Sequence, residues 1–282
     1  MDYKRILTIQ DISCVGQCSL TVALPILSAA GHETCILPSA VLSTHTAGFS
    51  GYTVRDLTED LPGITAHWRK EGIRFDAIYT GYLGSTEQIN DVKEIFRTCA
   101  AEGCVTIVDP AMADNGKLYP AFDQAYVEQM KTLAFQADII LPNITEACLL
   151  TGTDYHEGVW HRAELLDLLA ALRALGPEKI VITGIPQGEF IANLTAEGDA
   201  EPLRIRQHRI GESRSGVGDV FSAVIAADAV CGADFLSSVR RASAFVKKCI
   251  RRTVEMGIPR TDGLCFEEVL GQLRPWKGED HE

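Results

Sequence analysis

Short apolar runs alternate with longer amphipathic segments along most of the chain. The apolar runs fit strands that are buried on both faces of a parallel sheet. Several amphipathic segments are followed by glycine, as helices often are at their C-terminal ends. The pattern predicts strands over 6–10, 34–37, 75–80, 105–108, 138–141 and 179–184. It predicts helices over 19–30, 57–71, 87–102, 123–135, 162–175, 235–251 and 266–273, with two more that begin near 143 and 217.

This alternation predicts an α/β fold, with a central, mostly parallel sheet and helices on both faces. Residues 189–194 and 203–208 flank a turn-rich link and predict a small antiparallel edge. Residues 38–52 show no clean period, so we expect a functional loop or flap there. No repeat, low-complexity tract or linker divides the chain, and we expect a single domain over residues 1–282.

Polar residues follow the ends of several predicted strands. In open α/β sheets the ligand lies beyond the carboxyl ends of the strands, often at a helix start. The residues placed there by this pattern are Asp11, Tyr82, Asp109, Asn143, Thr183 and the turn at 216–218. The sequence therefore predicts one functional edge of the sheet.

The turn Gly216-Val217-Gly218-Asp219 precedes an apolar run that fits a buried helix. The first backbone N–H groups of a helix lack partners and lie at the positive end of its dipole, so they form an anion hole. Asp219, in the first turn, is placed to accept a proton from an attacking hydroxyl. The alternative is a tight turn followed by a carboxylate that only caps the helix.

Asp109 and Asp114 follow one strand, and Asn143 and Glu146 open the next helix. Mg²⁺ binds through one or two carboxylates together with water and substrate phosphates, which this set suits. Each residue also has an ordinary structural role, as a strand-end turn residue or a helix cap. Tyr82 and His45 offer rings for an aromatic ligand, or else are packing and loop residues.

Composition narrows the function classes. The net charge of −12 disfavours nucleic acid and anionic membranes as partners. Nine cysteines without a Cys-x-x-Cys pair fit neither a disulfide framework nor a zinc site and are typical of a reducing cytosol. No signal peptide or run of transmembrane length is present, so we expect a soluble cytoplasmic protein. A P-loop and a Gly-x-Gly-x-x-Gly fingerprint after the first strand are also absent.

Several motifs resemble one family. Gly216-Val217-Gly218-Asp219 is similar to the Gly-x-Gly-Asp signature of ribokinase-like kinases. Within that superfamily, five further motifs resemble those of the pyridoxal (pyridoxine, pyridoxamine) kinases. They are Ile9-Gln10, Ser43-Thr44-His45-Thr46, Thr80-Gly81-Tyr82-Leu83-Gly84-Ser85, Asp109-Pro110-Ala111-Met112 and Pro142-Asn143-Ile144-Thr145-Glu146. These matches run in family order from about residue 5 to residue 250.

The resemblance implies ATP-dependent phosphorylation of the 5′-hydroxymethyl group of a vitamin B6 vitamer, in B6 salvage. Asp219 would be the base, and the N–H groups of Gly216, Val217 and Gly218 would hold the transferring phosphoryl group. Asp109 and Glu146 would bind Mg²⁺. The residues implied on the ATP side are Asp109, Asp114, Asn143, Glu146, Thr183, Gly184, Gly216 and Gly218; those on the substrate side are Asp11, His45, Thr46, Tyr82 and Asp219. The family also implies a homodimer, and K⁺ is a further candidate cofactor.

Asp11 departs from the family pattern, which often has serine after Ile-Gln, where the serine binds the substrate ring. A carboxylate there could accept from the ring hydroxyl, or pair with a protonated ring nitrogen or with an amine. We therefore hypothesise a vitamer preference that differs from that of the serine-bearing members, towards pyridoxamine. Two alternatives stay open at this point. One is a hydroxymethylpyrimidine kinase of the same superfamily, and the other is a vitamer- or nucleotide-binding protein without turnover.

Overall fold

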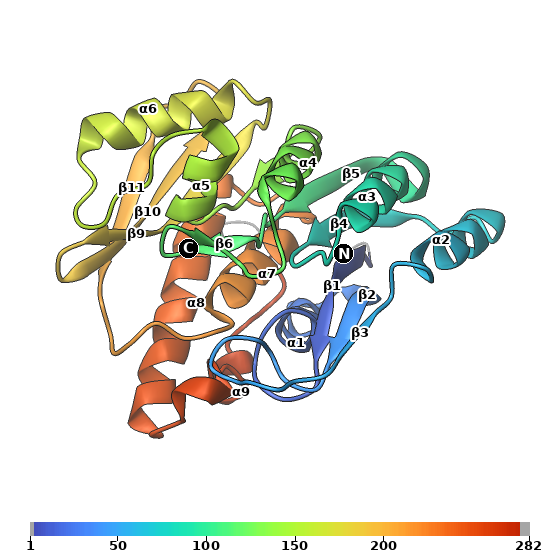
Figure 1. The fold of residues 1–282 in the computed structure, drawn as a ribbon, viewed down its shortest axis with the longest axis horizontal. Helices are drawn as coiled ribbons and strands as arrows, with labels where there is room; N and C mark the ends of the chain where they lie inside the picture. The colour runs from blue at the N-terminus through green and yellow to red at the C-terminus, as the bar shows by residue number, and fades with distance from the viewer. Residues whose placement is uncertain (1–2, 277–282) are drawn as a thin grey trace, which may run out of the picture.

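The computed structural model describes residues 3–276, and its centre is a nine-stranded sheet (Figure 1). The strand order is β11-β10-β9-β8-β5-β4-β1-β2-β3. The strands are β1 (Arg5–Ser13), β2 (Glu33–Leu42), β3 (Val54–Asp56), β4 (Phe75–Thr80), β5 (Ala100–Val108), β8 (Ile139–Ile140), β9 (Lys179–Gln187), β10 (Phe190–Glu197) and β11 (Leu203–His208). The six central strands, from β2 to β9, pair in parallel. Antiparallel pairs lie at both edges, β9-β10-β11 at one and β2-β3 at the other.

Helices cover both faces of the sheet, as predicted (Figure 1). One face packs against α2 (Leu61–Lys70), α3 (Thr86–Cys99), α4 (Gln124–Ala134), α5 (Ile144–Thr151) and α6 (Arg162–Arg173). The other packs against α1 (Leu20–Ala29), α7 (Val217–Ala229), α8 (Phe235–Glu255) and α9 (Glu267–Leu270). Two apolar cores therefore sandwich the sheet, which is why its central strands are apolar on both sides. No helix within residues 3–276 is long and apolar enough to cross a membrane.

The predicted loop over 38–52 is wrong in its first part. β2 continues through Leu42, which pairs with Ser13 of β1, and β3 adds three further strand residues. The sequence showed no clean period from residue 38 onward. The structure keeps Pro38 opposite Gln10 in the parallel pair, although proline cannot donate to a sheet. The irregular segment is accordingly shorter than the sequence pattern suggested.

Several other boundaries are also wrong. The helix predicted over 57–71 begins at Leu61, and the one predicted over 235–251 continues to Glu255. The helix predicted over 87–102 ends at Cys99, and β5 begins at the next residue, Ala100, because Ala100 pairs with Phe75 of β4. The last helix is limited to Glu267–Leu270. A small hairpin of β6 (Ala113–Asp114) and β7 (Lys117–Leu118) was not predicted. Its turn residues Asn115 and Gly116 both have positive φ, which is the usual Asn-Gly hairpin turn.

Candidate active site

The glycine turn opens α7 as the sequence predicted. Gly216 is the N-cap residue, with φ of 83°. A Cβ at this position would lie 2.3 Å from the carbonyl oxygen of Gln17, so only glycine fits. The first N–H groups of α7 have no acceptor within the helix, and the helix dipole makes this end positive. The turn is therefore built to hold an anion.

Asp219 lies in the first turn of α7 and is partly buried. Its Oδ2 accepts a hydrogen bond of 2.9 Å from the backbone N–H of Ser19, the N-cap residue of α1. Burial raises the pKa of Asp219 to about 6, and the nearby Asp11 carboxylate adds to the rise while the Ser19 N–H opposes it. A carboxylate with this pKa is ionised at neutral pH and is a better proton acceptor than an exposed aspartate.

Asp109 follows β5 and lies at the same turn. Its Oδ2 accepts a hydrogen bond of 2.8 Å from the hydroxyl of Ser222, one helical turn beyond Asp219. A Cβ on Gly218 would lie 4.0 Å from the same oxygen, which places Asp109 directly beside the anion hole. Burial, followed by the charge of Asp219, raises the pKa of Asp109 to about 7. The structure thus brings the two carboxylates close enough to influence each other's ionisation.

Glu146 is 2% exposed and links α5 to the loop after β5. Its Oε2 accepts from the Asn143 N–H at 2.8 Å, and its Oε1 from Met112 and Ala113 at 3.1 and 3.4 Å. Asn143 completes a capping box, because its Oδ1 accepts from the N–H groups of Thr145 and Glu146. Burial, and then the Asp109 charge, raises the pKa of Glu146 well above its usual value. Glu146 therefore holds this part of the site together.

The donor set fits Mg²⁺ that is shared with a substrate. Within residues 3–276, no group of three or more His, Cys, Asp or Glu side chains is arranged to hold a metal ion. Asp109 offers a carboxylate at the anion hole, whereas both oxygens of Glu146 already accept backbone N–H groups. One or two carboxylates beside an anion hole match an ion whose other ligands are water and phosphate oxygens.

The four other residues predicted on the nucleotide side fall into two groups, one that bridges the β8 and β9 segments and one at exposed positions. Asn143 and Thr183 form a parallel bridge that extends the pairing of β8 with β9. Gly184 is exposed, and its N–H donates to Asn193 Oδ1 at 3.3 Å. Asp114 is also exposed, and its carboxylate accepts from Asn115 in the β6–β7 turn. No hydrogen bond joins Asp114 or Gly184 to the α7 turn among the described residues.

On the predicted substrate side, Tyr82 follows β4 and packs at a tilt against Phe122, with ring centroids 5.4 Å apart. Burial, followed by the Asp11 charge, raises the pKa of Tyr82 to about 12. Asp11 is 5% exposed, in the part of β1 where the register with β2 shifts. Tyr82 and Asp11 therefore lie within electrostatic reach of one another.

The His-Thr loop is placed differently from the other substrate-side residues. His45 Nε2 lies 2.6 Å from the carbonyl oxygen of Thr261, and Nδ1 accepts the Ala47 N–H at 3.1 Å. Its ring also packs so closely on Gly16 that a Cβ there would lie 2.1 Å from it. Both ring nitrogens thus contact the backbone, and Thr46 beside it is exposed. The ring fastens this loop to the loop after β1.

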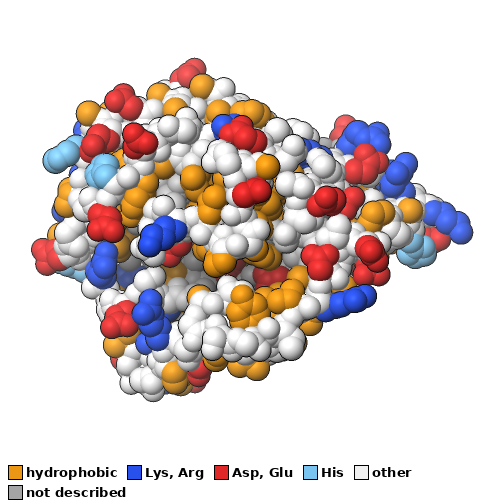
Figure 2. All heavy atoms as spheres, in the orientation of Figure 1, with side chains coloured by type: hydrophobic (Ala, Val, Ile, Leu, Met, Phe, Trp, Pro, Cys, Tyr) orange, Lys and Arg blue, Asp and Glu red, His pale blue; other side chains and the backbone are white. Residues whose placement is uncertain are grey.

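Sequence reasoning missed Ser19, Ser222 and Ser13, which hold the three aspartates in place. Ser222 had no local signal, because the carboxylate it binds, Asp109, is 113 positions away in the chain. Ser13 is two residues after Asp11 and donates to its Oδ2 at 3.1 Å. Ser19 had no such signal, since its role comes from its backbone N–H. Figure 2 shows a hollow near the centre of this face, over the region where Figure 1 draws α7.

Comparison with known proteins identifies the family of this chain. Residues 31–262 match the model of the phosphomethylpyrimidine kinase family. The chain belongs to that family. A solved pyridoxal kinase from Lactobacillus plantarum is 32% identical, with a TM-score of 0.88 over 96% of this chain and 97% of that one. The predicted membership among pyridoxal kinases and the ribokinase-like fold are confirmed.

Two other relatives are similar over most of their length. A candidate phosphomethylpyrimidine kinase from Bacteroides thetaiotaomicron VPI-5482, in a crystal form with pyridoxal, is 34% identical. It has a TM-score of 0.90, covering 98% of each chain. The pyridoxal kinase of Arabidopsis thaliana is 26% identical over 235 residues, which is 79% of this chain and 74% of that protein.

Proposed function

We propose that this protein is an ATP-dependent kinase that transfers a phosphoryl group to the 5′-hydroxymethyl group of a vitamin B6 vitamer. The observation that carries the proposal is Asp219 in the first turn of α7, beside a glycine turn that can hold an anion. The pyridoxal kinase from Lactobacillus plantarum and the pyridoxal-containing crystals of the Bacteroides protein support the substrate class.

The proposed reaction divides the work among a few groups. Asp219 accepts the proton of the 5′-hydroxyl as the hydroxyl oxygen attacks the γ-phosphorus of ATP, and the bond from that phosphorus to the leaving ADP oxygen breaks. The N–H groups of Gly216, Val217 and Gly218 at the start of α7 stabilise the charge of the transferring group. Positioning and charge neutralisation supply most of the catalysis in such transfers.

Mg²⁺ is the proposed metal cofactor, with Asp109 as its carboxylate and Glu146 as a further candidate ligand. When bound, it would neutralise the negative charge of the phosphates. The support is the position of Asp109 at Gly218, where phosphates would bind. Asn143 and Thr183 are proposed to line the nucleotide side, and Tyr82 to flank the pyridine ring. K⁺ dependence stays a prediction from the family resemblance.

We also propose that residues 1–282 form a single kinase domain, that the protein is a homodimer and that it works in the cytoplasm. The first proposal is supported by the continuous sheet within residues 3–276. Free cysteines throughout those residues support a reducing compartment. The homodimer rests on the family resemblance.

The test is ADP production by the purified protein with Mg·ATP and pyridoxal, pyridoxine, pyridoxamine or hydroxymethylpyrimidine. We expect turnover of at least one vitamer, and a loss of roughly 10²- to 10⁴-fold in kcat for Asp219→Asn, the range for a positioned base. Turnover of hydroxymethylpyrimidine alone would favour the second candidate, which the family match itself suggests. Absence of turnover by folded, ATP-binding protein would leave a binding protein without catalysis.

A further inference from the structure

Two carboxylates on the substrate side lack a cationic partner. Asp11 is 5% exposed, and Asp219 lies near enough for the Asp11 charge to raise its pKa. Within residues 3–276, no salt bridge is formed by either of them. Buried carboxylates are normally paired, because leaving water costs several kcal/mol that only a partner recovers. A positively charged group on a ligand could therefore act as the missing partner of these carboxylates.

The side chain that hydrogen-bonds Asp11 is a neutral donor, Ser13 at the end of the same strand. Ser13 donates its hydroxyl to Asp11 Oδ2 at 3.1 Å, and the Cys18 thiol in turn donates to Ser13 Oγ at 3.3 Å. Burial, then the charges of Asp219 and Asp11, raises the pKa of Cys18 to about 12, so it stays a thiol. The His45 ring is engaged by the backbone, because Nδ1 accepts the Ala47 N–H and Nε2 contacts the Thr261 carbonyl oxygen. Within residues 3–276, no lysine, arginine or histidine side chain forms a salt bridge with Asp11.

A short series of contacts links Asp11 to the proposed base: Ser13 donates to Asp11, Cys18 donates to Ser13, and Ser19, the next residue after Cys18, donates its N–H to Asp219. The Asp11 charge contributes to the raised pKa of Tyr82, the proposed ring neighbour, and to that of Asp219, the proposed base. A pyridine ring beside Tyr82 with its hydroxymethyl group at Asp219 would place other ring substituents near Asp11. The pairing of β1 with β2 shifts register between Gln10 and Ile12, at Asp11. Such irregularities often change the direction of a side chain next to a functional site.

We propose that Asp11 binds a protonated amine on the substrate and makes the enzyme select pyridoxamine over pyridoxine. The inference rests on the proposed function. These two vitamers differ only in the group next to the hydroxymethyl, an aminomethyl in one and a hydroxymethyl in the other. Only the aminomethyl group carries a positive charge at neutral pH. A charge-assisted hydrogen bond to a buried carboxylate is about twice as strong as a neutral one.

The experiment compares kcat/KM for pyridoxamine and for pyridoxine in the wild type, Asp11→Asn and Asp11→Ser. We expect the wild type to favour pyridoxamine. Both substitutions should lower the pyridoxamine-to-pyridoxine ratio by roughly 10- to 100-fold, the value of a hydrogen bond to a charged group. The ratio, unlike either rate alone, is insensitive to a general loss of folded or active enzyme.

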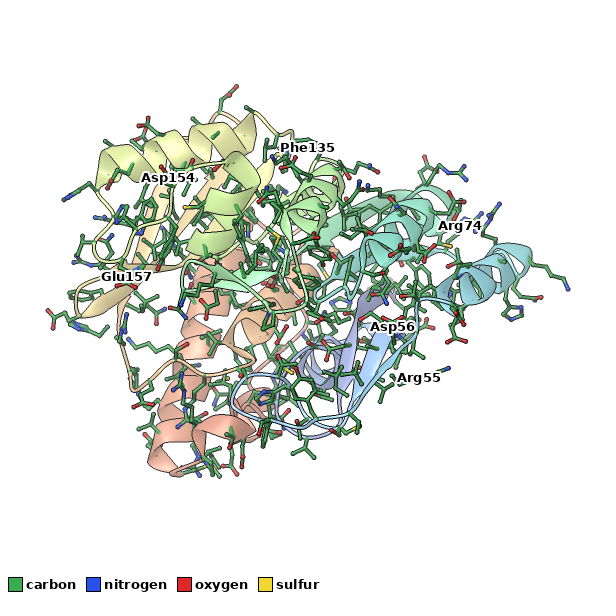
Figure 3. All side chains as sticks on the ribbon, viewed as in Figure 1. Arg55, Asp56, Arg74, Phe135, Asp154 and Glu157 are labelled. Atoms are coloured by element: carbon green, nitrogen blue, oxygen red, sulfur yellow. The ribbon has the colours of Figure 1, made fainter. Side chains whose placement is uncertain are left out.

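Asp56→Asn is the matched control. Asp56 lies on β3 and is labelled in Figure 3. It is exposed, and its charge also contributes to the raised pKa of Tyr82. Its replacement should leave the ratio unchanged, because solvent screens an exposed carboxylate. Ser13→Ala, which keeps the Asp11 charge but removes its hydroxyl partner, should also preserve the preference for pyridoxamine.

Calorimetric titration of the same proteins with each vitamer separates this inference from the proposed function. Phosphorylation of vitamers with an unchanged ratio in both Asp11 variants would overturn the inference and leave the kinase standing. A wild type that prefers pyridoxine would do the same. Absence of phosphorylation would overturn the kinase proposal, and the role of Asp11 would then be supported only by tighter binding of pyridoxamine that Asp11→Asn removes.

Discussion

The backbone N–H of Ser19 donates a 2.9 Å hydrogen bond to Asp219 Oδ2, and the two residues are 200 positions apart in the chain. Ser19 has φ of 52°, one of two positive values at non-glycine residues within 3–276. Such a conformation costs about 1–3 kcal/mol and persists where its surroundings enforce it. We infer that this strain at the start of α1 orients the proposed base.

Substitution of Ser19 should therefore show whether its positive φ is needed to hold Asp219 in place. Ser19→Val places a β-branched side chain at positive φ, which should turn the peptide away and break the bond to Asp219. We expect the acid limb of the kcat/KM profile to move to higher pH and kcat to fall about tenfold or more, since a hydrogen bond to a charged group is worth roughly 1.5–3 kcal/mol. Ser19→Gly, which tolerates this φ, should keep the limb in place. An unmoved limb in Ser19→Val would contradict the positioning role.

The pH dependence of activity should follow Asp219. Its pKa is raised to about 6, and only the ionised form can accept a proton. We expect kcat/KM to be constant between about pH 7 and pH 8 and to decline as pH falls through about 6. Rates in overlapping buffers from pH 5 to pH 8 would show this. A rate that stays level down to pH 5, as an exposed aspartate with a pKa near 4 would give, would be inconsistent with a buried base.

Ionisation of Asp109 should lower the free energy of unfolding. Burial and the Asp219 charge raise the pKa of Asp109 to about 7, so the folded protein favours its protonated form. The stability that this provides is complete below the unfolded-state pKa near 4 and is lost as pH rises through 7. Asp109→Asn should therefore raise the free energy of unfolding by on the order of 1–3 kcal/mol at pH 8 and by less at pH 5. Urea titrations at the two pH values in metal-free buffer test the sign.

Gly216 and Gly218 form a matched pair for the anion hole. Gly216→Ala puts a Cβ 2.3 Å from the Gln17 carbonyl oxygen at φ of 83°, so we expect a loss of about 2 kcal/mol or more in stability. Gly218→Ala meets only Asp109 Oδ2 at 4.0 Å, so its melting temperature should change little. Its KM for ATP should rise, because the methyl group enters the space next to the anion hole. Equal losses of stability in the two variants would contradict the prediction that Gly216 is needed for folding and Gly218 for ATP binding.

Glu146 should matter for the fold as well as for the reaction. Glu146→Gln replaces one acceptor oxygen with an NH₂ group that faces a backbone N–H. The unpaired buried donors should cost about 1–3 kcal/mol. Glu164→Gln is the control, because Glu164 occupies the same capping-box position on α6 but 42% of its side chain is exposed. Thermal melts should show the larger loss for Glu146→Gln, whereas equal losses would mean that burial contributes nothing there.

The sequence determined much of the fold and the general place of the site. Its alternation of apolar strands with amphipathic helices predicted the parallel sheet, since strands covered on both faces must be apolar throughout. The strand-end positions of Asp11, Tyr82 and Asp109 predicted a shared edge, because parallel strands end together. The turn before α7 could be predicted because glycine is favoured wherever the backbone takes a positive φ, which is a local property of the turn. The close approach of the Gln17 carbonyl oxygen, which also excludes a Cβ at Gly216, could not be predicted.

Tertiary structure alone decided how those residues are held. The Ser19 N–H bond to Asp219 joins two helix starts, and no local pattern encodes a backbone donor from a remote segment. β2 continued through Pro38 because its parallel partner β1 outweighed the local signal of proline. The sequence named Asp109 and Glu146 as carboxylates. Only packing decided that Ser222 binds one and that three backbone N–H groups hold the other, because these contacts depend on how the loop after β5 folds against α5 and α7.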